Sequence, residues 1–166
     1  MAEQMQEFAL APMSGFIRGL TLFLLALPVA FIGSALAGTA PVLFGPGLVL
    51  IAIFVWVWVR FRPTRFVVGP QAVDVYWPLK HRSIPRSSIQ SARRVDNAEL
   101  REIVGAGIRV GAGGLWGGFG WLWTARRGIA QMYVSRADGY VWIERGAERP
   151  WLITPEDPDG FVRALR

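Results

Sequence analysis

Few side chains in this chain could carry out catalysis. His81 is the only histidine and cysteine is absent, so neither a nucleophile–histidine triad nor a zinc site with nitrogen and sulfur ligands can be assembled. The acidic pairs have simpler explanations. Asp157 and Asp159 lie where a helix would begin and suit its capping, and Glu99 and Glu102 are typical of a solvated face. We therefore expect a protein that is not an enzyme and that uses neither a cofactor nor a metal.

The glycine-rich stretch 105–120, in which eight of sixteen residues are glycine, raises the question of a phosphate-binding loop. A Walker A loop ends in Gly-Lys-Ser/Thr, and no lysine follows Lys80. The dinucleotide fingerprint Gly-x-Gly-x-x-Gly is also broken, because Val110 stands where a third glycine would have to follow Gly105 and Gly107. We expect these glycines to let backbones and aromatic rings approach closely in a curved sheet.

Tryptophan and arginine form the strongest binding signal, both in the glycine-rich region and at the end of a long apolar run. Tryptophan prefers the membrane interface, and arginine pairs with lipid phosphate. Two interpretations of the glycine-rich region stay open: its rings fill a core, or the loop enters the headgroup layer or meets another membrane subunit. Both can hold in part, because alternate residues of a strand point opposite ways. The predicted contact residues are Trp56, Trp58, Arg60, Arg62, Arg65, Trp116, Phe119, Trp121, Trp123, Arg126 and Arg127.

The element that must position these residues is apolar. Between Arg18 and Arg60 there are 41 consecutive residues without a charge. One membrane crossing needs about 20 apolar residues, so this run suffices for two. Glycine and proline cluster between Gly38 and Gly47, and both residues end helices. The predicted segments are an N-terminal surface segment over 1–16 and a transmembrane hairpin over 17–62, with helices near 17–37 and 46–61.

The flanking charges predict the orientation of the hairpin. Arg18, Arg60, Arg62 and Arg65 lie at its two ends and the turn carries no Lys or Arg, which favours both termini in the cytoplasm. A cleaved signal peptide fits poorly, because its apolar core spans about 7–15 residues. A hydrophobic hairpin buried in a soluble partner remains a less favoured alternative.

The positive charge belongs to the part of the chain beyond the hairpin. From Arg60 onward there are 17 Lys and Arg residues against 10 Asp and Glu residues, a net charge of +7. Next to a bilayer this favours anionic lipid headgroups, at about 1 kcal/mol for each basic residue near the surface. Nucleic acid is the other acidic partner to consider, and it is disfavoured because no nucleic-acid-binding motif is present.

The C-terminal hundred residues show the period-two alternation of short strands. Asp157 and Pro158 are typical of a helix start, and the turn at 137–139 predicts a hairpin of its two flanking strands. The pattern over residues 100–103 does not clearly indicate a secondary structure. A twisted sheet or small barrel closed by the terminal helix would bury the apolar sides of both the sheet and the helix. The predicted strands lie over 64–68, 72–77, 82–85, 89–95, 129–134, 140–143 and 149–153.

Four segments resemble bacterial pleckstrin-homology-like (PH-like) domains, several families of which follow two membrane helices. They are Arg62-Pro63-Thr64-Arg65-Phe66-x-Val68, Ile84-Pro85 followed by Ile89, Gly117-Gly118-Phe119-Gly120, and the most specific, Ile153-Thr154-Pro155-Glu156-Asp157-Pro158-Asp159-Gly160-Phe161.

The resemblance implies an α+β domain over 63–166, a PH-like twisted antiparallel barrel or sandwich capped by a C-terminal helix. In PH-like domains a basic rim near one end of the barrel can hold acidic headgroups. The local basic sets that could supply one are Lys80, Arg82 and Arg86, or Arg93 and Arg94.

Two functional hypotheses follow. In the first, the protein is an integral protein of the bacterial inner membrane whose cytoplasmic PH-like domain binds lipid, with anionic headgroups preferred, or protein, as a scaffold. In the second, it is an accessory subunit of a larger inner-membrane assembly, such as a photosynthetic or respiratory complex. The small residues Gly15, Gly19, Gly33 and Ala37 would suit close helix packing in such an assembly.

Overall fold

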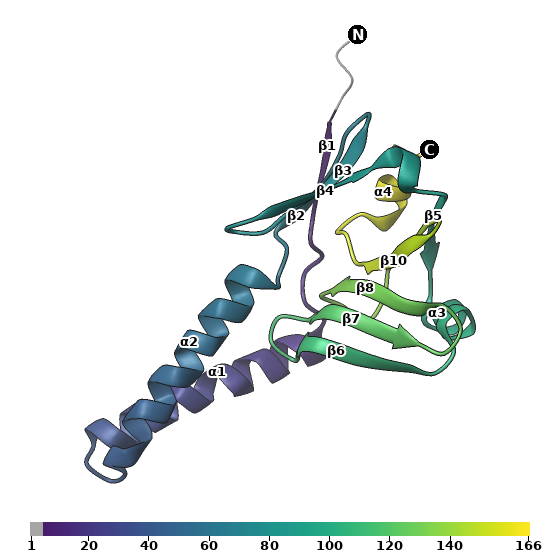
Figure 1. Cartoon of the computed structure of the whole chain (residues 1–166). Helices are drawn as coiled ribbons and strands as arrows, with labels where there is room; N and C mark the ends of the chain where they lie inside the picture. Colours follow the sequence, from purple (N-terminus) through teal and green to yellow (C-terminus); the bar gives the residue numbers. More distant parts are fainter. Residues whose placement is uncertain (1–4) are drawn as a thin grey trace.

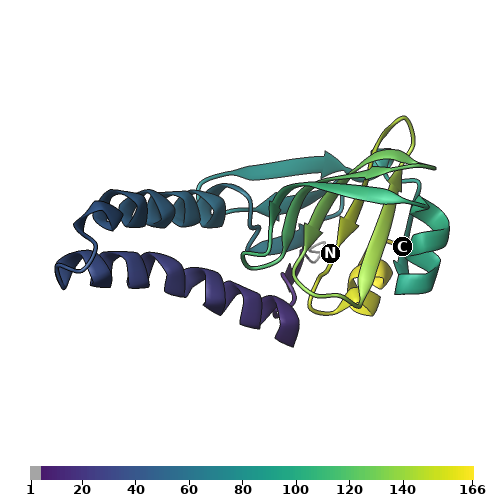
Figure 2. The same cartoon turned by 90° about the horizontal axis from the view of Figure 1, so that it is seen from below.

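The structure, a computed structural model, describes residues 5–166 and consists of a helical hairpin that projects from a β-rich domain (Figures 1 and 2). Residues 1–4 of the expected surface segment lie outside the described residues. The hairpin is formed by α1 (Gly15–Leu36) and α2 (Phe44–Arg60), joined by the 3-10 turn η1 (Pro41–Leu43). The two predicted helices are confirmed, each within two residues at either end.

Both helices are long and apolar enough to cross a membrane, over Gly15–Leu36 and Pro41–Arg60. Most of their side chains face outward, so they do not form the core of the domain. They contact each other closely at Gly47, where an added Cβ would lie 2.7 Å from Ile32 Cγ1. The hairpin thus leaves a wide apolar surface that water does not solvate well.

A four-stranded antiparallel sheet continues from the hairpin, in the order β1-β2-β3-β4. Its strands are β1 (Gln6–Ala9), β2 (Arg65–Val68), β3 (Ala72–Tyr76) and β4 (His81–Pro85). Strand β1 comes from the segment expected to lie on the surface, and it pairs with β2. Its side chains are mostly exposed, so the sequence carries no clear alternation there. Leu10 and Ala11, just after it, are buried.

A six-stranded sheet makes the other layer, in the order β5-β9-β10-β8-β7-β6. Its strands are β5 (Ser91–Val95), β6 (Gly107–Gly113), β7 (Gly118–Thr124), β8 (Gly128–Val134), β9 (Tyr140–Arg145) and β10 (Glu148–Ile153).

The predicted hairpin of the strands on either side of residues 137–139 is wrong. Strand β10 lies between β8 and β9, parallel to β8 and antiparallel to β9. The turn reverses the chain, but it does not choose the partner of the strand that follows. Trp151, Leu152 and Ile153 of β10 are all buried, and a strand that is apolar on both faces is stable in the middle of a sheet.

Helix α3 (Asn97–Val104) occupies the segment that the alternation left undefined. Asp96 accepts hydrogen bonds from the N–H groups of Ala98 and Glu99, and the Glu99 carboxylate accepts one from the Asp96 N–H. This capping box satisfies donors that the first helical turn leaves free. Leu100, Ile103 and Val104 then join the cluster on one face of the six-stranded sheet.

The two sheets form a sandwich and do not close into a barrel, which corrects that part of the expected fold. Between them lies the main core, with Phe66, Val75 and Trp151 among its fully buried residues. The predicted terminal helix is confirmed as α4 (Pro158–Ala164), and Asp157 accepts a hydrogen bond from the Gly160 N–H. Phe161 of α4 is inserted into this core.

The turn between β6 and β7 anchors the domain to the hairpin. The hydroxyl of Thr21, within α1, donates to the Gly114 carbonyl at 3.2 Å and accepts from the Trp116 N–H at 3.0 Å. The rings of Trp58 and Trp116 meet edge to face with their centroids 4.8 Å apart. The end of α2 is thereby held close to the β-rich domain (Figure 1).

Candidate anion-binding pocket between the sheets

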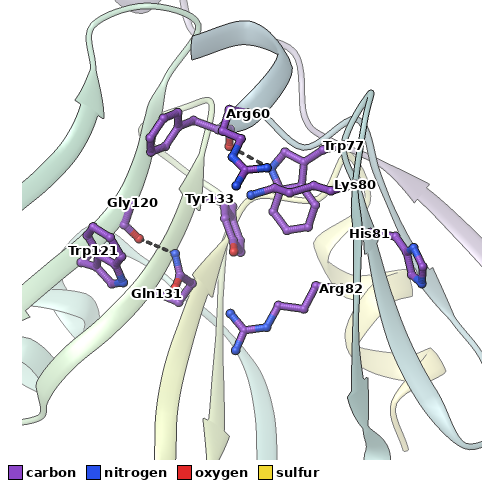
Figure 3. A pocket seen from close by; sticks show the side chains of 10 residues that line it. Arg60, Trp77, Lys80, His81, Arg82, Gly120, Trp121, Gln131 and Tyr133 are labelled. Atoms are coloured by element: carbon purple, nitrogen blue, oxygen red, sulfur yellow. Dashed lines mark hydrogen bonds between the residues drawn. The ribbon is translucent and has the colours of Figure 1, made fainter. Parts of the chain in front are cut away.

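A cavity of about 420 Å³ lies where the end of α2 meets the opening between β4 and strands β7 and β8 (Figure 3). It is formed by elements far apart in the sequence, and it is bordered by basic, aromatic and amide side chains. The lining residues are Arg60, Phe61, Trp77, Lys80, His81, Arg82, Gly120, Trp121, Gln131 and Tyr133.

Three cations converge on this cavity. Arg60 is the last residue of α2, and Lys80 and Arg82 precede and follow His81 at the start of β4. Alternation along the strand turns the His81 ring the other way (Figure 3), where it stacks on Tyr76. Among the described residues none of the three cations forms an ion pair, and no acidic side chain lines the cavity. The cavity therefore has an excess of positive charge.

Aromatic and amide groups hold the walls in place. The Trp77 indole N–H donates to the Phe61 carbonyl at 3.0 Å, which ties β3 to the end of α2. The Lys80 ammonium lies 4.4 Å from the centroid of the Trp77 ring, a cation–π contact. On the opposite wall Gln131 Nε2 donates to the Gly120 carbonyl at 2.7 Å.

The pKa shifts in the cavity follow from burial and from like charges. Burial lowers the pKa of Lys80, and the neighbouring charges of Arg60 and Arg82 lower it further. Burial raises the pKa of Tyr133 to about 12, although the positive charge of Arg82 opposes part of the shift. At neutral pH Tyr133 is therefore a phenol that can donate a hydrogen bond. A bound anion would relieve the repulsion among the cations.

Of the contact residues predicted from the sequence, only Arg60 and Trp121 line this cavity. Trp58 and Trp116 pack together on another side of α2, where the Arg62 guanidinium lies 4.4 Å from the Trp58 ring centroid. Burial lowers the pKa of Arg62, and its buried Nε has no hydrogen-bond partner among the described atoms.

The predicted residues of the β-rich domain lie apart from one another. Arg65 pairs with Glu7 at 3.4 Å, on the four-stranded sheet. Arg126 donates to the Glu102 carbonyl, and Arg127 pairs with Glu144 at 3.5 Å. These two arginines follow β7, at the end opposite the turn that touches α1.

The aromatic residues divide between core and surface, as strand alternation allows. Trp116 and Phe119 are buried, whereas Trp121 and Trp123 are 39% and 53% exposed. Trp56 is exposed on α2, and its ring meets that of Phe61. Contact of these residues with a membrane or a partner stays a prediction.

Sequence reasoning missed most of the cavity. Lys80 and Arg82 were noted as a local basic set, and their spacing of two in a strand places them on one face. Nothing in the sequence joins that face to Arg60, because the Trp77 bond to Phe61 and the position of β8 depend on the tertiary fold. No pattern in the sequence marks Trp77, Gln131 or Tyr133 as a lining residue.

Comparison with known proteins supplies the family. The profile of the family described as bacterial PH domain matches residues 64–166, well over half of the chain. Neither the curated proteins nor the solved structures give a match. The matched region contains both walls of the cavity but not Arg60, which the hairpin contributes. Since the matched region extends from β2 to α4, the chain belongs to the bacterial PH domain family.

Proposed function

We propose that this protein is a membrane-tethered, non-enzymatic PH module that binds the anionic headgroup of a phospholipid in the cavity between its sheets. The observation that carries the proposal is the convergence of Arg60, Lys80 and Arg82, none of which has an ion-pair partner in the described part of the chain. A phosphate group would pair with them, and the Tyr133 phenol could donate to it. The hairpin would place the cavity beside the bilayer.

The exposed face of α2 below the cavity supports a lipid rather than a soluble anion. Val49, Ile53 and Trp56 are exposed, and with Arg60 they follow the spacing of one helix face. An acyl chain could lie along this stripe while its headgroup occupies the cavity. We also propose that the protein lies in a bacterial inner membrane. Both termini and the domain would be in the cytoplasm, and the turn at η1 would be outside.

The test is lipid binding by the full-length protein in nanodiscs that contain phosphatidylcholine with a minor fraction of phosphatidylglycerol. Replacing two cations near the headgroup should weaken binding by roughly 2 kcal/mol, or about 30-fold. The variant is Lys80→Gln with Arg82→Gln. The matched control, Arg101→Gln with Arg149→Gln, removes the same charge from exposed positions on α3 and β10.

Native mass spectrometry of the released complexes would count the bound phosphatidylglycerol. The proposal expects loss in the cavity variant and retention in the control. Equal loss in both variants would show that net charge alone attracts the lipid, and would contradict a specific cavity.

A second candidate function, that of an accessory subunit in a membrane assembly, is favoured by α1. An added Cβ at Gly15, Gly19 or Gly33 would meet no atom within 4 Å, so the contact with α2 does not use these small positions. They could admit another helix at close range. Native gels of gently solubilised source membranes, with mass spectrometry of the bands, test this function. A free monomer as the largest species would count against it.

A further inference from the structure

Strand β6 is an open edge of the six-stranded sheet. It has seven residues, Gly107–Gly113, and over residues 5–166 it pairs only with β7. Such an edge presents unpaired backbone N–H and C=O groups along one side. Natural edges are commonly protected by proline, bulges or several charges, yet β6 has no proline and Arg109 is its only charge. Its backbone is available as a template for another strand.

This edge is held in position rather than loose. Thr21 fixes the turn after β6 through its bonds to Gly114 and Trp116. Within the strands, Gly111 faces Gly120 so closely that a Cβ on Gly111 would lie 2.3 Å from the Phe119 carbonyl oxygen. An edge that is already ordered loses little conformational freedom when a partner binds.

The two sides of β6 differ in chemistry. Ile108 pairs with Trp123 and Val110 with Trp121, so these four residues form an apolar ledge, and they are 38–68% exposed. Arg109 points to the opposite side, where it lines a groove with Tyr140 and Arg136. Among the described residues Arg109 has no ion-pair partner, whereas Arg136 pairs with Asp138 at 3.3 Å.

The far end of the ledge, Ile108 with Trp123, lies beyond the reach of lipid headgroups, whereas Trp121 borders the cavity proposed to hold one. Trp116 contacts the hairpin, and Trp123 comes seven residues later, after a path of roughly 20 Å along β7. Strand β7 leads away from the turn that contacts α1 (Figure 1), whereas the second half of β6 shares a groove with Phe16 and Leu20 of α1. The headgroup layer adds only about 5 to 8 Å on each side of the hydrocarbon. A second copy of the chain is also disfavoured, because each carries a net +7 from Arg60 onward.

We propose that β6 receives an extended segment of a partner protein in which apolar and acidic residues alternate. The segment adds a strand to the sheet, its apolar residues lie beside Ile108 and Val110, and its carboxylates face Arg109. Backbone pairing supplies the affinity, and the alternating side chains supply the specificity. This inference uses none of the three cavity cations and can fail without the proposed headgroup function, although Trp121 of the ledge also borders the cavity.

The experiment uses the full-length protein in nanodiscs of phosphatidylcholine alone, so that anionic lipid is absent. The probe is an eight-residue peptide in which valine and glutamate alternate, with both ends blocked. One control peptide has lysine in place of glutamate, and another has proline at its centre. Peptide affinity is measured by titration, and hydrogen–deuterium exchange is followed over residues 107–113.

The expected result is at least tenfold slower exchange over residues 107–113 with the valine–glutamate peptide, and no such protection with either control peptide. Arg109→Glu should lower the affinity for the valine–glutamate peptide at least fivefold. Arg149→Glu changes the net charge equally at an exposed position on β10, and it should have less than a twofold effect.

Three results would overturn the proposal: unchanged exchange at saturating peptide, equal effects of Arg109→Glu and Arg149→Glu, or tight binding of the proline peptide. Protection of β6 in the absence of peptide would also overturn it. If that protection came with a dimer in mass photometry, the edge would belong to a second copy. If it required phosphatidylglycerol, the edge would belong to the membrane surface.

Discussion

Tyr133 shows how one residue serves both the core and the candidate site. Its ring meets those of Trp77 and Trp151 edge to face, with centroids 5.3 and 5.6 Å away, while the residue borders the cavity. The same burial that stabilises the ring raises its pKa to about 12. The phenol is therefore protonated at every physiological pH.

Tyr133→Phe should change how the free energy of unfolding varies with pH in the alkaline range. Because the folded pKa of Tyr133 lies above the unfolded value of about 10, the hydroxyl contributes stability below about pH 10, and that contribution is lost as the pH rises toward 12. The free energy of unfolding of the wild type should thus fall more steeply than that of the variant between pH 10 and 12. Denaturant titrations across this range measure it, and parallel slopes would contradict the assigned shift.

At the scale of elements, local chemistry set the helix ends and tertiary contacts chose the strand partners. Asp157 and Pro158 are local signals for the start of α4. Asp96 and Glu99 have the spacing of a capping box, which is a local signal for the start of α3. These signals act within one turn of helix. The position of β10 between β8 and β9 has no such local signature.

Thr21→Val should loosen the joint between the hairpin and the domain. The substitution keeps the shape but leaves the buried Trp116 N–H without its acceptor, which costs about 1–3 kcal/mol. We expect hydrogen exchange over residues 113–117 to accelerate roughly tenfold or more, since 1.4 kcal/mol corresponds to a factor of ten. Thr21→Ser retains the hydroxyl and should behave like the wild type. Equal acceleration in both variants would show that lost packing, not the hydrogen bond, is responsible.

At the scale of the whole molecule, a long apolar hairpin carries a basic domain (Figure 2), and the cavity of that domain lies where the second helix ends. Arg60 belongs to both parts, because it terminates α2 and lines the cavity. A truncated protein that begins at residue 64 would therefore lack Arg60, one of the three cations of the cavity. If the proposed function holds, this single residue couples tethering to binding.

Membrane topology can be tested directly because the chain has no cysteine. In a bacterial host, Thr39→Cys in the turn of the hairpin should react with a membrane-impermeant maleimide in intact spheroplasts. Arg149→Cys in the domain should react only after permeabilisation. The reverse pattern, or labelling of Thr39→Cys only after permeabilisation, would contradict the proposed orientation.

The sequence alone determined the features whose causes are local or compositional. Forty-one uncharged residues predict two long apolar helices, and alternation predicts the strands that are buried on one face, such as β3. It could not reveal β1, whose exposed side chains show little pattern, or the open sandwich in place of a barrel. Only the tertiary structure brought Arg60, Lys80 and Arg82 together, and left the edge of β6 open. Their convergence depends on which sheet edges meet, and strand pairing is a long-range choice that neighbouring residues do not encode.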